Sequence, residues 1–199
     1  MNINLSTRRQ ILGIGVASVG ALALTHVAKA QDATTQAAPA ASDAELLRMC
    51  LLVEQVGAAY YSQVLASQNT RAYLPTELAT AAAQMLETKN AHISTIVGAL
   101  GNTAAGTPTF KFPFQALVSR KAMPWLGHRL EEIANGAHLT ALDTLSNRAL
   151  RPAVIGIIGA NSANAGILQH VLSAEFADHF FEIKLTPAQV EMYISAYRA

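Results

Sequence analysis

The sequence places a lysine and a histidine on a helix face that is otherwise apolar. Counting from His92 in steps of three and four residues stays on one side of a helix. The residues on that side are Leu78, Ala82, Met85, Lys89, His92, Ile96 and Ala99. Five of these seven are apolar, so the face is predicted to be buried. A buried polar group without a partner costs about 1–3 kcal/mol, so Lys89 and His92 require polar partners on neighbouring helices.

Two further helical segments also carry polar residues within an apolar stripe. In the first expected helix this stripe consists of Leu47, Leu51, Glu54, Ala58, Tyr61 and Leu65. In the fourth it consists of Val154, Ile157, Asn161, Asn164, Leu168 and Val171. The spacing is typical of a helix-bundle seam. Asn161 and Asn164 have the same three-residue spacing as Lys89 and His92, which predicts that these groups meet at one level of a bundle.

An internal repeat adds a fourth helix to this level. The segments VEQVGAAYYSQVL and LEEIANGAHLTAL align Glu54 with Glu131 and Tyr61 with His138. The residues on the same helix face as Glu131 are too polar to predict that this face is buried. The prediction that Glu131 lies in the polar level therefore rests on the repeat. Each half of the chain then consists of two helices joined by a turn.

Local signals set the expected boundaries of the helices. Ser42 and Glu45 form a capping-box pattern for a first helix that ends near Ser67. Later helices are expected at 75–101, 124–145, 152–173 and 186–197. The connection after Gly101 carries Phe110, Phe112 and Phe114, which should pack against the bundle. Strand patterns are absent, so the predicted class is all-α: a four-helix bundle with a long crossover between helices 2 and 3 and a short fifth helix.

The first 30 residues are predicted to be an export signal. A basic start, MNINLSTRRQ, precedes a short apolar run that ends at AKA, which predicts cleavage after Ala30. The pair Arg8-Arg9 resembles a twin-arginine signal; the alternative is a retained amphipathic anchor. The expected location is periplasmic or secreted, with residues 31–41 a disordered linker and residues 42–199 the helical bundle.

Composition excludes several classes of function. Cys50 is the only cysteine, so neither an intrachain disulfide nor a Cys/His zinc site can form. Removing residues 1–30 takes away three of fourteen basic residues, leaving eleven against thirteen acidic ones. No basic patch interleaves with aromatic residues, so nucleic-acid binding is not expected. The mature chain has no uninterrupted run of 18 apolar residues, so no transmembrane helix is expected; a homodimer is compatible with such a bundle.

Across most of the mature chain the sequence resembles the ferritin-like superfamily, in particular the group related to desiccation-associated proteins. The segments that carry the resemblance are LLVEQVGAAYYSQVL, AHISTIVGALG and TPTFKFPF. Metal-binding members take one Glu from each of helices 1 and 3, and Glu-x-x-His from each of helices 2 and 4. The resemblance therefore implies that Glu54, Glu131 and His92 are residual ligand positions. It also implies degenerate positions, with Lys89 in place of a glutamate and with Asn161 and Asn164 in place of the second motif.

Charge then decides between the possible occupants of the site. Glu54, Glu131 and Lys89 sum to −1, which cannot offset the +4 of two divalent metal ions in a low-dielectric interior. We therefore expect no cofactor, with the Lys89 ammonium paired to both glutamates and the asparagines bonded to His92 or to each other. The alternative is one iron or zinc ion on Glu54, His92 and Glu131, with His128 as an additional candidate.

Each of these alternatives, no cofactor or one metal ion, implies a different function. The first is a non-enzymatic envelope or stress-associated protein with a degenerate di-metal site. The second is a mononuclear metal-binding oxidoreductase or metal-handling protein. The sequence favours the first because of Lys89, Asn161 and Asn164.

Overall fold

The computed structural model describes residues 41–101, 104, 106–172 and 183–199. The segment predicted to be a signal, residues 1–30, lies outside the described residues, as does the predicted linker up to residue 40. Ala41, assigned to that linker, is already helical. Export and cleavage therefore stay predictions.

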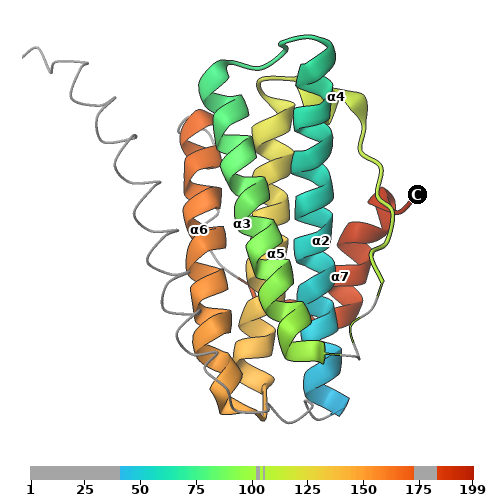
Figure 1. Cartoon of the computed structure of the whole chain (residues 1–199), viewed down its shortest axis with the longest axis vertical. Coiled ribbons are helices and arrows are strands. Elements are labelled where there is room, and N and C mark those ends of the chain that lie inside the picture. The colour runs from blue at the N-terminus through green and yellow to red at the C-terminus, as the bar shows by residue number, and fades with distance from the viewer. Residues whose placement is uncertain (1–40, 102–103, 105, 173–182) are drawn as a thin grey trace, which may run out of the picture. The chain divides into compact units, whose positions relative to one another are not determined.

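Four long helices lie side by side and form the bundle (Figure 1). They are α2 (Ala41–Thr70), α3 (Thr76–Leu100), α5 (Ala122–Thr144) and α6 (Arg151–Leu172). Helices α2 and α3 form one antiparallel hairpin, and α5 and α6 form another. Because α3 and α5 run in the same direction, the connection between them returns along the length of the bundle. Within the described residues there is no strand, and the isolated bridge between Phe110 and Arg198 is the one β contact found. The predicted all-α crossover bundle is confirmed.

Local signals placed some helix ends correctly and missed others. Pro75 precedes α3, and Gly101, with φ +54°, ends it as expected. Ser42 lies inside α2 rather than at its cap, so the predicted capping box at Ser42 is wrong. The same helix continues to Thr70, three residues beyond the predicted end.

Asp43, next to Ser42, has a tertiary role that the sequence does not reveal. Its carboxylate accepts hydrogen bonds from the Ser146 backbone N–H (2.9 Å), the Ser146 hydroxyl (2.8 Å) and the Asn147 N–H (2.9 Å). Burial alone would raise the pKa of Asp43, but these donors outweigh it and hold the pKa below its ordinary value of 3.8. The carboxylate thereby joins the start of α2 to the turn between α5 and α6.

Asp43→Asn is expected to lower the free energy of unfolding by about 2 kcal/mol at neutral pH, because hydrogen bonds to a charged acceptor are the stronger kind. A carboxyl group whose pKa is lower in the folded protein than in the unfolded one stabilises the fold when the pH is above its unfolded-state pKa. That contribution is lost as the pH falls through the folded-state pKa. The difference between wild type and variant should therefore be constant above about pH 5 and shrink below it. Urea titrations across pH measure this. Glu45→Gln, on the exposed side of α2, is the matched control and should change little.

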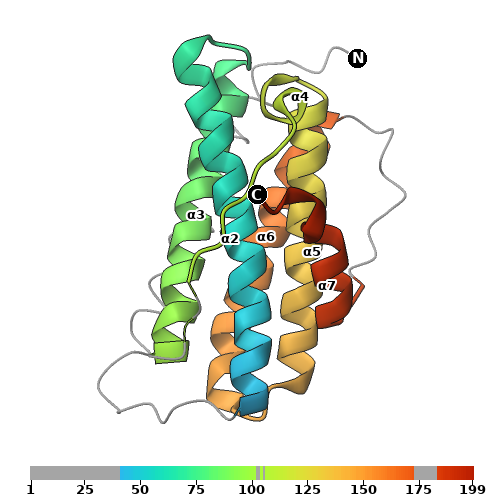
Figure 2. The ribbon, with the colours of Figure 1, turned by 90° about the vertical axis from the view of Figure 1, so that its right-hand side faces the viewer.

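The crossover between α3 and α5 is fixed along one side of α2 (Figure 2). It includes a short helix, α4 (Phe114–Val118), which the sequence pattern did not reveal. Gln63 Nε2 donates to the Phe110 carbonyl at 2.8 Å. The rings of Phe110 and Phe112 are buried, as expected for rings that pack against the bundle, whereas Phe114 is 55% exposed and its ring contacts Tyr73.

The C-terminal segment, residues 183–199, contacts the crossover through hydrogen bonds and ring packing. It contains α7 (Pro187–Ile194), which lies against α2 and α5, and a short 3-10 turn η4 (Ser195–Tyr197). Thr186 and Gln189 make the predicted capping box. The Lys111 N–H donates to the Tyr197 carbonyl at 2.8 Å, and the ring of Tyr197 packs on Phe112 with centroids 5.1 Å apart.

The apolar core is divided into two parts. Along α3, Leu78, Ala82 and Met85 belong to one apolar cluster, whereas Ile96 and Leu100 belong to the other. Lys89 and His92 lie between them on the same buried face. The predicted stripe is correct except that Leu100, not Ala99, ends it. The interruption of the core is the level at which all four long helices contribute polar side chains.

Candidate functional site: a buried lysine between two glutamates

Lys89 is the centre of the polar layer. Its ammonium nitrogen lies 3.2 Å from Glu54 Oε2 on α2 and 2.7 Å from Glu131 Oε2 on α5. It also donates a hydrogen bond of 2.9 Å to Asn161 Oδ1 on α6. All four residues are fully buried. The ion pairs predicted for Lys89 are therefore present, and one residue from each long helix takes part.

Glu54 accepts donors at both carboxylate oxygens. Asn161 Nδ2 donates to Oε1 at 2.8 Å, while Lys89 and His92 Nδ1, at 3.0 Å, face Oε2. The amide of Asn161 is thus oriented by its two partners, with its oxygen towards the ammonium and its NH₂ towards the carboxylate. The predicted contact of the asparagines with His92 is wrong for Asn161, whose partners are the charged groups.

Glu131 is bound by fewer donors. The Tyr61 hydroxyl donates to its Oε1 at 2.8 Å, and Oε2 faces Lys89. Tyr61 belongs to the predicted stripe of α2 and lies seven residues after Glu54, but its bond goes to the glutamate of the other repeat. The repeats therefore exchange contacts across the bundle.

The charges of the cluster stabilise one another. Burial alone would raise the pKa of Glu54, yet Lys89 and His92 outweigh it and hold the pKa well below its ordinary value. Burial would lower the pKa of Lys89, but Glu131 and Glu54 raise it, so the ammonium stays charged. Burial raises the pKa of Glu131 and Lys89 offsets this only in part. Glu54 is therefore the stronger acid of the pair.

His138 and Asn164 extend the polar layer, and His138 Nδ1 lies 3.7 Å from Glu54 Oε1. His138 Nδ1 donates to the Ala134 carbonyl at 2.8 Å, which leaves Nε2 as an acceptor in the neutral ring. Burial lowers the pKa of His138, so the ring is uncharged at neutral pH. Its Nε2 and Asn164 Nδ2 have no hydrogen-bond partner among the described residues.

Gly57 makes room for the stem of Lys89. A Cβ added at Gly57 would lie 2.9 Å from Lys89 Cε and 3.2 Å from Cδ. The aligned position in the repeat is Ala134, so a methyl group fits on α5 where α2 has none. Sequence reasoning did not assign this role, although a glycine in the middle of a helix is a signal, because it costs about 1 kcal/mol relative to alanine. Gly57 and Lys89 form a matched pair of small and long residues.

Gly57→Ala is expected to destabilise the fold by about 1–3 kcal/mol, because the new methyl group forces the lysine stem out of its place. The cost should largely disappear in a Lys89→Ala background, where the stem is absent. Thermal unfolding of the two single variants and the double variant measures this coupling. Gly159→Ala is the matched control: nothing lies near its Cβ position on α6, so helix propensity should make it neutral or slightly stabilising. Additive costs for Gly57 and Lys89 would contradict the pairing.

Other candidate ligands lie elsewhere. His128 Nδ1 is 3.7 Å from Glu132 Oε2 on the outer side of α5, so the structure does not bring it to Glu131. His170 is exposed at the end of α6. Among the described residues no group of three or more His, Cys, Asp or Glu side chains is arranged to hold a metal ion.

The residues present do not fit a two-metal centre. Each of the four carboxylate oxygens of Glu54 and Glu131 already faces a protein donor. The space between the carboxylates holds an ammonium whose stem is accommodated by Gly57. Two carboxylates and one ammonium leave a net charge of −1, far from what two divalent ions need.

The helical bundle agrees with a comparison of known families. A family model described as a ferritin-like domain matches residues 42–174, two thirds of the chain. The chain belongs to the ferritin-like family. No curated protein and no solved structure matches it. The matched range includes every residue of the Lys89 cluster, so the cluster lies inside the ferritin-like domain itself. None of the described helices of this ferritin-like protein is long and apolar enough to cross a membrane.

Proposed function

We propose that this ferritin-like protein has replaced a di-metal centre with a buried ion-pair cluster and acts without redox catalysis, as an envelope or stress-associated protein. The observation that carries the proposal is the position of the Lys89 ammonium, 3.2 Å from Glu54 and 2.7 Å from Glu131. One positive charge stands where the family pattern implies metal. Glu54, His92 and Glu131 are then residual ligand positions, and Lys89, Asn161 and Asn164 are the substituted ones.

The neighbours of Lys89 support an ammonium group that stays between the two carboxylates, rather than a side chain that moves aside for a metal ion. Asn161 orients its oxygen towards it, and Gly57 provides space for its stem. A mononuclear site would require Lys89 to leave both carboxylates, and would leave an ammonium to be accommodated elsewhere in a buried layer. The hydrogen bonds therefore favour the metal-free function over the oxidoreductase or metal-handling alternative.

Export by a twin-arginine-type signal, with cleavage after Ala30, is part of the proposal. The Arg8-Arg9 pair and the AKA sequence before Gln31 support it. The resemblance of the sequence to desiccation-associated proteins suggests a role in stress tolerance, which this proposal adopts. Replacing Arg8 and Arg9 with lysines should retain the uncleaved chain in the cytoplasm, as measured by cell fractionation.

Metal analysis of the protein purified after native export tests the central claim. We expect less than one tenth of a metal ion per chain, roughly the level of adventitious binding, and an unfolding temperature that a chelator leaves unchanged, because the cluster does not depend on a metal. His92→Ala is the diagnostic variant. A stoichiometric iron or zinc ion that is lost in His92→Ala would overturn the proposal and favour the mononuclear alternative.

A further inference from the structure

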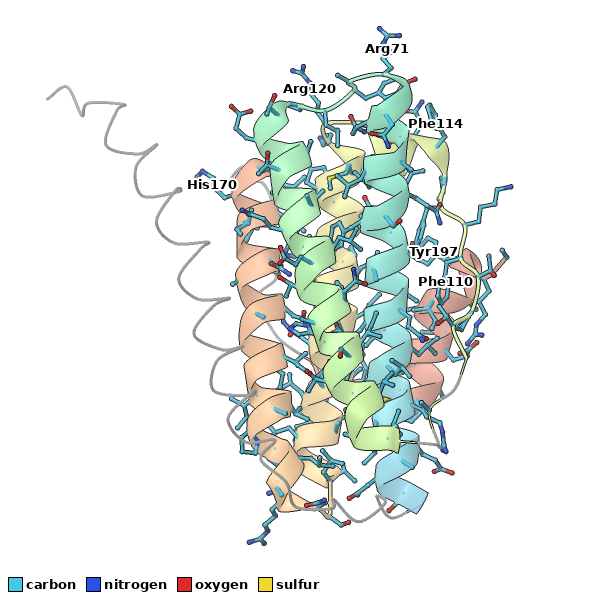
Figure 3. All side chains as sticks on the ribbon, viewed as in Figure 1. Arg71, Phe110, Phe114, Arg120, His170 and Tyr197 are labelled. Carbon is cyan, nitrogen blue, oxygen red and sulfur yellow. The ribbon has the colours of Figure 1, made fainter. Side chains whose placement is uncertain are left out.

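One end of the bundle exposes aromatic and basic side chains together. At this end α2 turns into α3 and α4 leads into α5, and Arg71, Arg120 and Phe114 all lie there (Figure 3). We call it the basic-aromatic end and define it by Arg71, Tyr73, Phe114, Arg120 and Trp125. Phe114 is 55% exposed and Trp125 is 45% exposed. Two large aromatic side chains are therefore exposed at the same end of the bundle as two arginines.

Three side chains of this end, Arg71, Tyr73 and Phe114, contact one another across two turns. The rings of Tyr73 and Phe114 meet edge to face, with centroids 5.8 Å apart. The guanidinium carbon of Arg71 lies 5.5 Å from the centroid of Tyr73. The α2–α3 turn and the start of α4 therefore form one continuous surface rather than two separate loops.

The backbone beneath this surface is held firmly. The Tyr60 hydroxyl lies 2.7 Å from both the Ala116 and Met123 carbonyl oxygens, which joins α4 to α5 from below. Gln68 Oε1 accepts hydrogen bonds from the backbone N–H groups of Tyr73 and Leu74, both at 2.9 Å. A rigid backbone presents the aromatic rings without a large entropy loss on binding.

The two described turns at this end, α2–α3 and α4–α5, carry more basic than acidic residues. Residues 71–77 and 113–125 contain Arg71, Arg120 and Lys121 but only one acidic residue, Glu77. A partner of these two turns is therefore expected to offer negative charge and to accept exposed rings. Arginines and lysines are attracted to anionic lipid headgroups, while tryptophan and phenylalanine favour the boundary between headgroups and acyl chains.

We propose that the basic-aromatic end binds the surface of an anionic phospholipid membrane. Arg71 and Arg120 would contact lipid phosphates, and Trp125 and Phe114 would insert their rings at the level of the headgroups. A polyanion without apolar groups, such as polyphosphate, would pair with the arginines but would leave the exposed rings without a partner, so the rings favour the lipid surface. The inference is independent of the Lys89 cluster, which is buried in the middle of the bundle.

Intrinsic fluorescence gives a direct test, because Trp125 is the only tryptophan of the chain. The mature protein is mixed with phosphatidylglycerol vesicles or with phosphatidylcholine vesicles in physiological salt. We expect the emission of Trp125 to shift to shorter wavelength, and the protein to sediment with the vesicles, for phosphatidylglycerol only. Each surface arginine should contribute about fivefold to the partition coefficient, so Arg71→Gln with Arg120→Gln should lower it about 25-fold.

Matched controls separate this end from the rest of the surface. Arg148→Gln, an exposed arginine at the opposite end of the bundle, should leave the partition coefficient unchanged. Phe114→Ala should weaken binding without altering its dependence on salt, since it removes apolar contact and no charge. Arg71, Arg120 and Arg148 are exposed, so their variants should unfold near the wild-type temperature. Phe114→Ala also removes the ring contact with Tyr73, so its vesicle binding is measured well below its own unfolding temperature.

Three outcomes would overturn the proposal. One is an unshifted emission with phosphatidylglycerol vesicles. Another is an equal shift with phosphatidylcholine, which would remove the role of the arginines. The third is an equal shift with soluble polyphosphate, which would identify a soluble anion as the partner.

Discussion

Replacing Lys89 with methionine is expected to lower the free energy of unfolding by about 3–5 kcal/mol. Methionine has a similar length and fits the space beside Gly57, so the packing changes little. The electrostatics change completely, because Glu54 and Glu131 remain buried without the cation that lies 3.2 and 2.7 Å from them. Asn161 also loses the donor to its oxygen. The loss approaches half of the stability of a typical domain.

Urea or thermal unfolding of the purified protein measures this effect. Lys184→Met is the matched control, because Lys184 pairs with Asp143 at 2.7 Å on the exposed surface. Exposed pairs of this kind contribute about 1 kcal/mol or less. A Lys89→Met variant no less stable than Lys184→Met would refute the view that the ammonium holds the two carboxylates together.

Removing the lysine should also create affinity for a divalent cation. Lys89→Ala leaves two buried carboxylates with His92 beside Glu54, and Zn²⁺ would supply the missing positive charge through carboxylate and imidazole ligands. At a zinc concentration about 100 times the dissociation constant, the variant should gain about 2.7 kcal/mol of stability. Wild type should gain none, because its ammonium already faces the same oxygens.

Calorimetric titration together with thermal unfolding in zinc and in chelator distinguishes the two proteins. Adding Glu54→Gln to Lys89→Ala removes one of the two carboxylates and should abolish the gain, which controls for zinc bound at surface histidines. If wild type and Lys89→Ala respond equally to zinc, the ammonium does not exclude metal and the proposed function fails.

Much of the cluster was accessible from sequence patterns. The three- and four-residue spacing around His92 and the repeat that aligns Glu54 with Glu131 placed the polar groups at one level. The charge count then indicated that Lys89 pairs with both glutamates, and the structure has both pairs. These inferences succeeded because helix periodicity fixes which residues share a face, and a buried charge admits few partners.

Other parts of the site depended on distances between helices. The partners of Asn161 lie 72 and 107 residues away along the chain, on two different helices. The space that Gly57 leaves for Lys89, and the exposure of Phe114, depend on how closely neighbouring segments approach. No local pattern contains that information, because it is set by the rotation and axial position of each helix in the packed bundle.

The sequence by itself determined the all-α class, the helix ends at Pro75, Gly101 and Thr186, and most residues of the buried polar layer, with His138 the exception. Those features follow from backbone capping chemistry and from the burial of one helix face, both of which act over a few residues. Only the tertiary structure decided which donor faces which carboxylate oxygen, that Asp43 joins α2 to the α5–α6 turn, and that aromatic and basic residues meet at one end. Such contacts join residues far apart in the chain, and packing of the whole bundle sets their geometry.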